Sequence, residues 1–240
     1  MIDWLRRASF EPVVEVAGRA LPLAIRRHSR AKRMILRLGE GGKDVCVTIP
    51  PWGRTADALA FARSRAGWLE GQLARLPEPA CPLDEGQIAF RGQTLAVDWA
   101  ADRPRKPVLA GGTLRIGGPR DTLTRRLQRW LEGEAERVMA DDLAQYCGKA
   151  GVIVPPLRLS RARRRWGSCS GKGVIRINWR LIQAPDHVRR SVVAHEVAHL
   201  LHFDHSPAFH ACLARLYEDD IREADRWLKH KGRTLYRQFG

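Results

Sequence analysis

The sequence predicts an α+β protein with a β-rich N-terminal domain over residues 1–118, followed by a domain with a small β-sheet and long helices over residues 119–240. Two observations support this division. Short apolar stretches bounded by turn residues dominate the first half, whereas apolar residues at helical spacing dominate the second. The composition changes near Gly117-Gly118-Pro119, where we place the domain boundary.

Short strands are expected at the start of the chain because β-branched and apolar residues cluster there. The expected strands cover residues 13–16, 21–25, 34–38 and 45–49. Gly39–Asp44 separates the last two as a hairpin, and Pro50-Pro51 ends the final strand because proline cannot donate a ladder hydrogen bond.

One amphipathic helix is expected over residues 55–76, capped by Thr55 or Asp57 and closed by the prolines that follow. Further strands are expected at 87–90, 94–99 and 113–116. Residues 100–112 are rich in proline, glycine and charge, which predicts a loop.

The second domain opens with a long helix from Thr122 to about Ala150, with Gly151 available to end it. Strands are expected at 157–160, 165–169 and 174–179, and the last two form a hairpin through Gly171-Lys172-Gly173. Three helices follow, over residues 186–202, 206–217 and 220–230. Ser206 precedes Pro207, an N-cap followed by a proline at the first helical position.

Composition favours a soluble, cytoplasmic protein. No apolar run approaches the roughly 20 residues of a membrane span, and residues 1–10 lack the features of a secretory signal. The cysteines stand at positions 46, 81, 147, 169 and 212 with no CxxC pair. This spacing matches neither a disulfide framework nor a cysteine zinc site, and it is consistent with a reducing compartment.

The chain is strongly basic, with 42 Lys and Arg against 26 Asp and Glu and a net charge of +16. Residues 19–37 hold seven basic side chains and no acid, and residues 157–190 hold ten against Asp186 alone. Two interpretations stay open: solvated surface charge, or a surface that binds a polyanion such as nucleic acid or an acidic substrate.

The motif His195-Glu196-Val197-Ala198-His199 lies within an apolar helical run. Residues four apart share a helix face, so His195 and His199 can bind one zinc ion while Glu196 reaches a water beside it. The alternative is two histidines buried on a helix without a metal. Burying these polar groups without a metal would cost several kcal/mol in desolvation.

A catalytic zinc usually has three protein ligands and one open position, so a third ligand is expected. His202 follows on the same helix and is poorly aimed, whereas His205 stands directly before the Ser206 cap, where the chain must turn. We therefore favour His205. A carboxylate ligand, Glu218 or Glu223, is the alternative.

Several motifs together resemble those of one known family. They are the segments Arg165–Ser170 and Asn178–Leu181, the His195–His199 motif, His205-Ser206 with Phe209, and Trp227–Lys229. The chain resembles the YgjP-like zinc metallopeptidases, a group close to SprT-like and other zincin proteases. The resemblance extends upstream through Arg26–Met34 and the helix with Trp68, so it covers nearly the whole chain. His210 departs from it, because the family commonly has an aromatic residue there.

The resemblance implies a zincin-like catalytic domain with an HExxH active-site helix and Zn2+ as cofactor. It implies metal ligands at His195, His199 and His205, with Glu196 as the base. From their place beside this helix, Arg165 and Trp166 are candidate substrate-binding residues, for strand addition of a peptide or for steadying an oxyanion. Alternatively, Trp166 and Trp179 only lock the hairpin onto the helix.

The leading functional hypothesis is a zinc-dependent metallopeptidase acting on a peptide or protein. A second is a metal-dependent nucleoside triphosphate hydrolase that uses the arginine-rich segment 161–165. A third is a basic nucleic-acid module with structural zinc, or with protease activity on DNA-bound proteins. No membrane partner is expected, and residues 1–118 are expected to form an accessory domain that shapes or covers the cleft.

Overall fold

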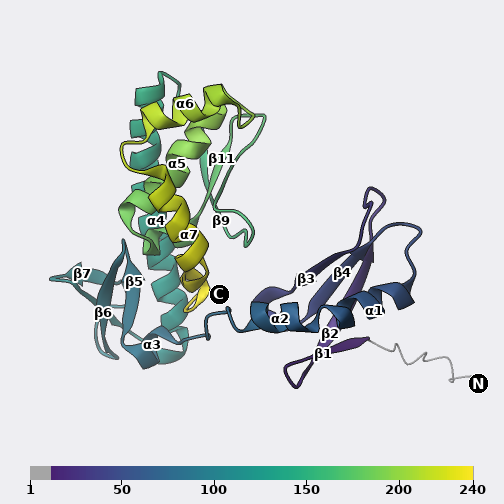
Figure 1. The fold of residues 1–240 in the computed structure, drawn as a ribbon. Helices are drawn as coiled ribbons and strands as arrows, with labels where there is room; N and C mark the ends of the chain where they lie inside the picture. The colour runs from purple at the N-terminus through teal and green to yellow at the C-terminus, as the bar shows by residue number, and fades with distance from the viewer. Residues whose placement is uncertain (1–11, 240) are drawn as a thin grey trace, which may run out of the picture. The chain divides into compact units, whose positions relative to one another are not determined.

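The computed structural model describes residues 12–239 and has a mixed α+β architecture of small sheets and several helices (Figure 1). The chain divides into two compact units, Met1–Leu76 and Pro77–Gly240. The boundary expected near residue 118 therefore differs from the one in the structure. Among the described residues, no helix combines the length and apolar character needed to cross a membrane.

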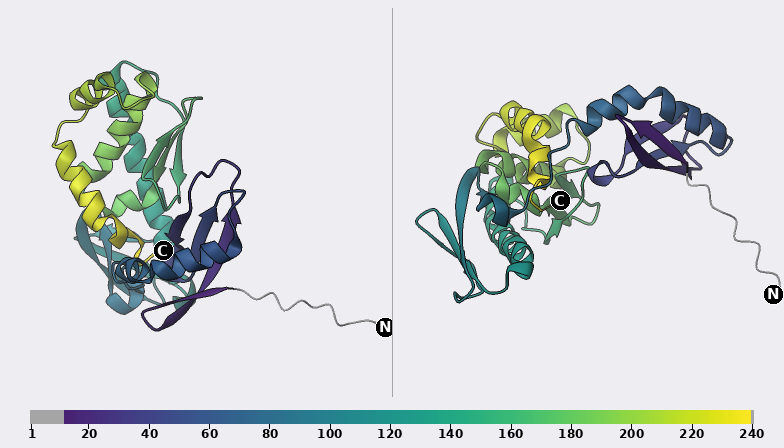
Figure 2. Two further views of the ribbon diagram at one scale, coloured as in Figure 1. Left: turned by 45° about the vertical axis from the view of Figure 1, so that its right-hand side comes forward. Right: turned by 90° about the horizontal axis from the view of Figure 1, so that it is seen from below.

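The first unit is a four-stranded sheet with two helices along one face (Figures 1 and 2). Its strands are β1 (Val13–Val16), β2 (Arg19–Arg27), β3 (Ile35–Leu38) and β4 (Val45–Ile49). They lie in the order β1-β2-β4-β3, with β2 and β4 parallel and the other pairs antiparallel. The alternation seen in the sequence places Val14, Val16 and Val47 in the core of this unit.

The helix expected over residues 55–76 is two helices, α1 (Thr55–Ser64) and α2 (Ala66–Leu73). Arg65 leaves helical geometry, with φ −108° and ψ 15°, and its N–H bonds back to Ala62. Gly67 follows at once, and glycine is a weak helix former. Both helices still contribute to one core, α1 through Ala58 and Ala62 and α2 through Leu69.

A second four-stranded sheet starts the second unit: β5 (Gln87–Phe90), β6 (Gln93–Ala100), β7 (Val108–Ala110) and β8 (Thr113–Gly117), preceded by the short helix α3 (Pro82–Glu85). Its buried residues share one core with the long helix α4 (Leu123–Ala150), and Phe90 and Trp130 stack with ring centroids 5.0 Å apart. This shared core is why the sheet belongs to the C-terminal unit. The expected loop 100–112 contains β7, a short exposed edge strand.

The two four-stranded sheets share one topology. The second has the order β5-β6-β8-β7, again with one central parallel pair. Val14 pairs with Leu21 in the first hairpin, and Ile88 pairs with Leu95 in the second. Both hairpins turn through two residues with positive φ, Ala17-Gly18 and Arg91-Gly92, which is the geometry of a tight β-hairpin turn. Each sheet is followed by a helix that covers its buried face.

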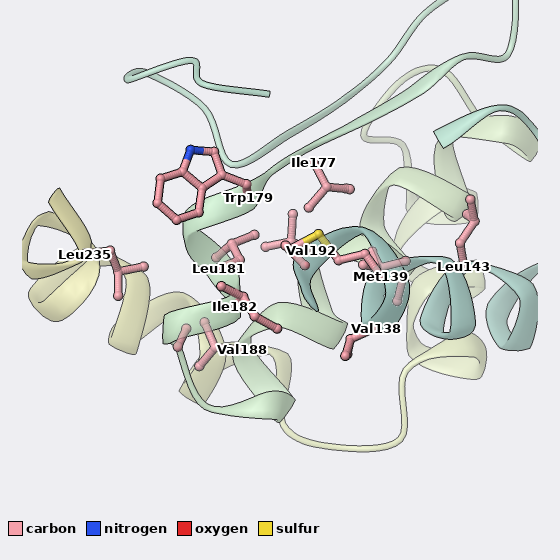
Figure 3. Close-up of a cluster of buried hydrophobic side chains, with 14 of the residues drawn as sticks. Val138, Met139, Leu143, Ile177, Trp179, Leu181, Ile182, Val188, Val192 and Leu235 are labelled. Carbon is pink, nitrogen blue, oxygen red and sulfur yellow. The ribbon is translucent and has the colours of Figure 1, made fainter. Parts of the chain in front are cut away.

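The remaining elements form a three-stranded sheet and a group of helices. The strands are β9 (Leu157–Ser160), β10 (Gly167–Cys169) and β11 (Ile175–Asn178), in the order β10-β11-β9, and the helices are α5 (Asp186–Leu201), α6 (Pro207–Leu216) and α7 (Ile221–Lys231). Figure 3 shows part of their core, where Ile177, Trp179 and Val192 are buried with residues of α4. Helix α5 contacts α4, α6, α7 and β10, so it lies at the centre of this unit.

Charged side chains fix α5 in place. Arg189 is almost completely buried and donates to Asp142 of α4 over 2.7 Å, while also pairing with Asp186 at the start of α5. Arg190 pairs with Asp142 and Glu218. Moving α5 away from α4 would separate the buried Arg189 from Asp142 and leave both charges without a partner, which is strongly unfavourable. These ion pairs therefore help to fix the helix that carries the histidine motif.

Candidate metal centre

Helix α5 presents His195 and His199 on one face, one turn apart. Their Nε2 atoms lie 3.1 Å from each other. The helix ends at Leu201, and His202 adopts an extended conformation with φ −137°. The chain therefore leaves the helix axis immediately after the second histidine.

The side chain of His205 lies next to those of His195 and His199. Ser206 caps α6 through its Oγ, which accepts from the Phe209 N–H over 3.4 Å. This turn brings His205 Nε2 to 3.3 Å from His195 Nε2. Across residues 12–239, His195, His199 and His205 form the group of candidate ligands, with one ring nitrogen each and all within 4.8 Å of one another.

The ring of Phe209 packs against all three imidazoles. It is fully buried, and its ring centroid lies 5.0, 4.6 and 4.9 Å from those of His195, His199 and His205. Aromatic contacts at these distances are favourable. The sequence indicates Phe209 only through the family resemblance, because its role depends on the path of α6.

The protonation of the histidines suits metal binding. His199 Nδ1 lies 3.0 Å from the His202 carbonyl, which only accepts, so Nδ1 carries the proton and Nε2 is left free to bind. Burial, reinforced by the neighbouring histidines, lowers the pKa of His195 to about 4. A neutral imidazole is the form that binds a metal.

Glu196 lies beside the histidines with a buried carboxylate. Its side chain is 5% exposed, and Oε2 has no hydrogen-bond partner among the described residues. Burial raises the pKa of Glu196 to about 7, against the opposing effects of Arg165 and the Cys169 backbone. A Cβ at Gly167 would overlap Glu196 Oε1, so only glycine lets β10 lie this close to the carboxylate.

A cavity of about 230 Å³ opens beside this group. It is lined by residues of β10 and its approach, of α5 and of α7: Trp166, Gly167, Ser191, Val192, His195, Glu196, Ile221 and Asp225. Trp166 lines the cavity, whereas Arg165 is exposed and acts on Glu196 through its charge. Ile221 and Asp225 were missed, since nothing in their spacing ties them to the histidine motif.

The carboxylates considered as a third ligand lie elsewhere. Glu218 is paired with Lys149, at 3.0 Å, and with Arg190. Glu223 is exposed on the first turn of α7 and does not belong to the histidine group. The structure thus gives the carboxylate alternative no support.

The two tryptophans near the hairpin and the arginine-rich segment 161–165 also make contacts within the protein. Trp179 is fully buried, and Trp166 packs on Tyr236 with ring centroids 5.8 Å apart, so both tryptophans help to lock the hairpin. In the arginine-rich segment, Arg161 pairs with Glu132 over 2.8 Å and Arg163 lies over the Tyr236 ring. Two of the four arginines in the segment thus have partners within the protein, while Arg164 and Arg165 are exposed.

The donor set fits a zinc ion. Three imidazole nitrogens converge, and a buried carboxylate with an unpartnered oxygen lies beside them. Three protein ligands with a base next to the open position are typical of a catalytic zinc site, whereas structural sites are usually rich in cysteine.

A family model described as YgjP-like, metallopeptidase domain, matches residues 32–231. No curated protein and no solved structure matches the chain.

Proposed function

The chain belongs to the YgjP-like family, defined by a metallopeptidase domain, and from this premise we propose that it is a zinc-dependent metallopeptidase that hydrolyses peptide bonds with Glu196 as general base. The observation that carries the proposal is the convergence of His195, His199 and His205 beside the buried carboxylate of Glu196.

In this proposal the three histidines hold the metal through Nε2 of His199 and a ring nitrogen of each of the others. A zinc ion there supplies a Lewis acid and lowers the pKa of bound water toward about 7. Glu196 takes the proton of the attacking water on its carboxylate and later delivers it to the leaving amine.

The substrate is proposed to lie along β10, which is one of the two edge strands of its sheet. An extended peptide can pair with such an edge, next to Trp166 in the cavity. Arg165 lies two residues before this strand, where its cationic side chain can stabilise negative charge on the substrate. The five cysteines are all free, which supports the cytoplasm as the place of action.

Glu196→Gln tests the assignment. The variant keeps all three imidazoles, so it should retain metal by elemental analysis while its hydrolysis of an unfolded protein falls by at least about 100-fold. Glu223→Gln makes the same change on an exposed turn and should behave as wild type. Full turnover by Glu196→Gln, or phosphate release from nucleoside triphosphates in place of peptide cleavage, would contradict the proposal.

A further inference from the structure

The first unit contains a groove of its own, with a volume of about 360 Å³. The residues that line it come from β3 and the segment before it, from α1 and α2, and from the junction between these two helices: Arg33, Met34, Ile35, Leu36, Phe61, Arg65 and Trp68. None of the candidate metal-centre residues contributes. The groove is larger than the cavity beside the histidines.

The lining of the groove combines aromatic faces with cationic groups. Trp68 is 47% exposed, although it is one of the largest apolar side chains of the unit. The Arg65 guanidinium lies 5.7 Å from the centre of the Phe61 ring. Large aromatic side chains left open in a concavity are typical of a surface that binds a partner.

The edge of β3 runs beside the groove. This strand is last in the order β1-β2-β4-β3, so in the described part of the chain only its β4 side is paired. Its other side therefore presents backbone N–H and C=O groups at strand spacing. An extended peptide can add to such an edge, and every second side chain then points to the same face.

The basic side chains of the first unit indicate which kind of peptide the groove would bind. Residues 12–76 carry twelve Lys and Arg against five Asp and Glu, and no acidic side chain lines the groove. Arg33 and Arg65 make no ion pair with any residue between 12 and 239. Lys32 precedes β3, and the exposed Arg37 lies within it. These cations favour an acidic occupant.

We propose that this groove is a docking site for an extended acidic segment of a protein, which pairs with the free edge of β3 and places an apolar side chain against Trp68. Arg33 and Arg65 bind its carboxylates. The site goes beyond the proposed hydrolysis, because it would hold a substrate or partner protein at a place separate from the scissile bond. A single-stranded nucleic acid would meet the same arginines and the same tryptophan, but it lacks the row of peptide groups that pairs with a strand edge.

The test measures binding by fluorescence anisotropy to the full chain carrying Glu196→Gln, so that cleavage does not interfere. The probe is a labelled peptide of about ten residues in which every second residue is serine and the positions between are glutamate and leucine in turn, so that both reach the same face of the added strand; its length spans a typical strand. Three further probes are the same peptide with lysine for glutamate, the acidic peptide with alternate backbone nitrogens methylated, and a thymidine oligonucleotide of similar length. The acidic peptide should bind best, and methylation should weaken it by at least about tenfold, because it removes the strand hydrogen bonds.

Matched variants locate the site. Arg33→Glu and Arg65→Glu should each weaken binding of the acidic peptide by about tenfold, whereas Arg19→Glu, the same change at the tip of the β1–β2 hairpin, should have little effect. Trp68→Ala should weaken binding of the acidic peptide, whereas Trp68→Phe should keep most of the affinity. Thermal unfolding measures how much of each variant is folded, and binding affinities are compared at equal concentrations of folded protein.

Three results would overturn the proposal. If the methylated peptide binds as well as its parent, or if the oligonucleotide binds more tightly than either peptide, the surface recognises polyanions and not an added strand. If Arg19→Glu weakens binding as much as Arg33→Glu, net charge alone is responsible. None of these outcomes depends on hydrolysis, so the docking site and the proposed function fail or stand separately.

Discussion

At the scale of single residues, the candidate metal centre depends on where the chain turns. His202 and His205 follow the same helix, yet the structure uses the backbone carbonyl of His202 and the imidazole of His205. The difference comes from the end of α5 at Leu201 and the Ser206 cap, which together redirect His205. The end of one helix and the cap of the next therefore decide which of two nearby histidines joins the candidate metal centre.

We predict that His205→Ala lowers metal content as severely as His199→Ala, since each removes one of three ligands. His202→Ala should keep the metal, because alanine still offers the carbonyl that accepts from His199 Nδ1. His210→Ala should keep it as well, since the His210 ring lies 6.5 Å from that of His205. Elemental analysis of the purified variants measures these outcomes. Loss of metal from Glu223→Ala instead would identify a different ligand set.

Gly167 offers a second prediction at this scale. Gly167→Ala places a Cβ against the Glu196 carboxylate, so it should displace that group and reduce hydrolysis by at least about tenfold. Gly171→Ala in the same hairpin meets nothing within 4 Å and serves as the control. Activity and thermal unfolding are measured together for both variants. Equal activity of the two variants would show that the close approach of β10 does not position Glu196.

The sequence predicts part of this centre and not the rest, for a physical reason. His195, Glu196 and His199 lie on one helix, so their spacing alone indicates a shared site, and the Ser206 cap points to His205. Phe209, Ile221 and Asp225 reach the site only through the packing of α6 and α7. No local pattern encodes such packing.

At the scale of elements, α5 is held by ion pairs as well as by apolar packing. Glu218 follows α6 and joins Arg190 of α5 to Lys149 and Tyr146 of α4. Partial burial alone would raise the pKa of Glu218, but hydrogen bonds from Lys149, Arg190 and Tyr146 outweigh burial and lower it to about 2. The charged form of Glu218 therefore stabilises the folded unit.

We predict that Glu218→Gln lowers the free energy of unfolding at neutral pH by about 1 kcal/mol, a value kept small because the side chain is 38% exposed. A depressed carboxyl pKa contributes stability that is present above about pH 4.5 and is lost as the pH falls toward 2. Urea titrations across this range should show a shallower acid loss for the variant. Glu136→Gln, on the exposed face of α4, is the control, and metal content should be unchanged in both.

Most elements were predictable because turn residues mark their ends. The hairpin turns at Gly39–Asp44 and Gly171–Gly173 and the end of α4 at Gly151 all follow local rules and are confirmed. The interruption at Arg65 and the strand β7 were not predicted. All three residues of β7 are exposed, so it has no apolar alternation, and its pairing with β8 is what makes it a strand.

At the scale of the whole molecule, the division of the chain follows burial more closely than composition. Glycine and proline at residues 117–119 suggest a linker, yet Leu114 and Ile116 before them share a core with Leu123 and Leu127 after them. Periodicity shows that an apolar face must be covered, but it does not name the element that covers it. The boundary lies instead between Leu76 and Pro77.

We predict that residues 77–240 alone form a cooperative unit that retains metal. A shorter fragment, residues 119–240, lacks β5 to β8, so it exposes the side of α4 that this sheet buries and should aggregate or unfold without a sharp transition. Circular dichroism during heating, with metal analysis of each fragment, measures the difference. If both fragments unfold with equal cooperativity, the domain boundary lies near residue 118.

The repeated sheet has a consequence for engineering. The same strand order and register occur twice, yet the link between the last two strands covers residues 39–44 in one sheet and only 111–112 in the other. The frame therefore tolerates a change in loop length at this corner without a slip in register. The link at residues 111–112 is accordingly the place to graft a foreign peptide, a tag or a sensor loop into this protein.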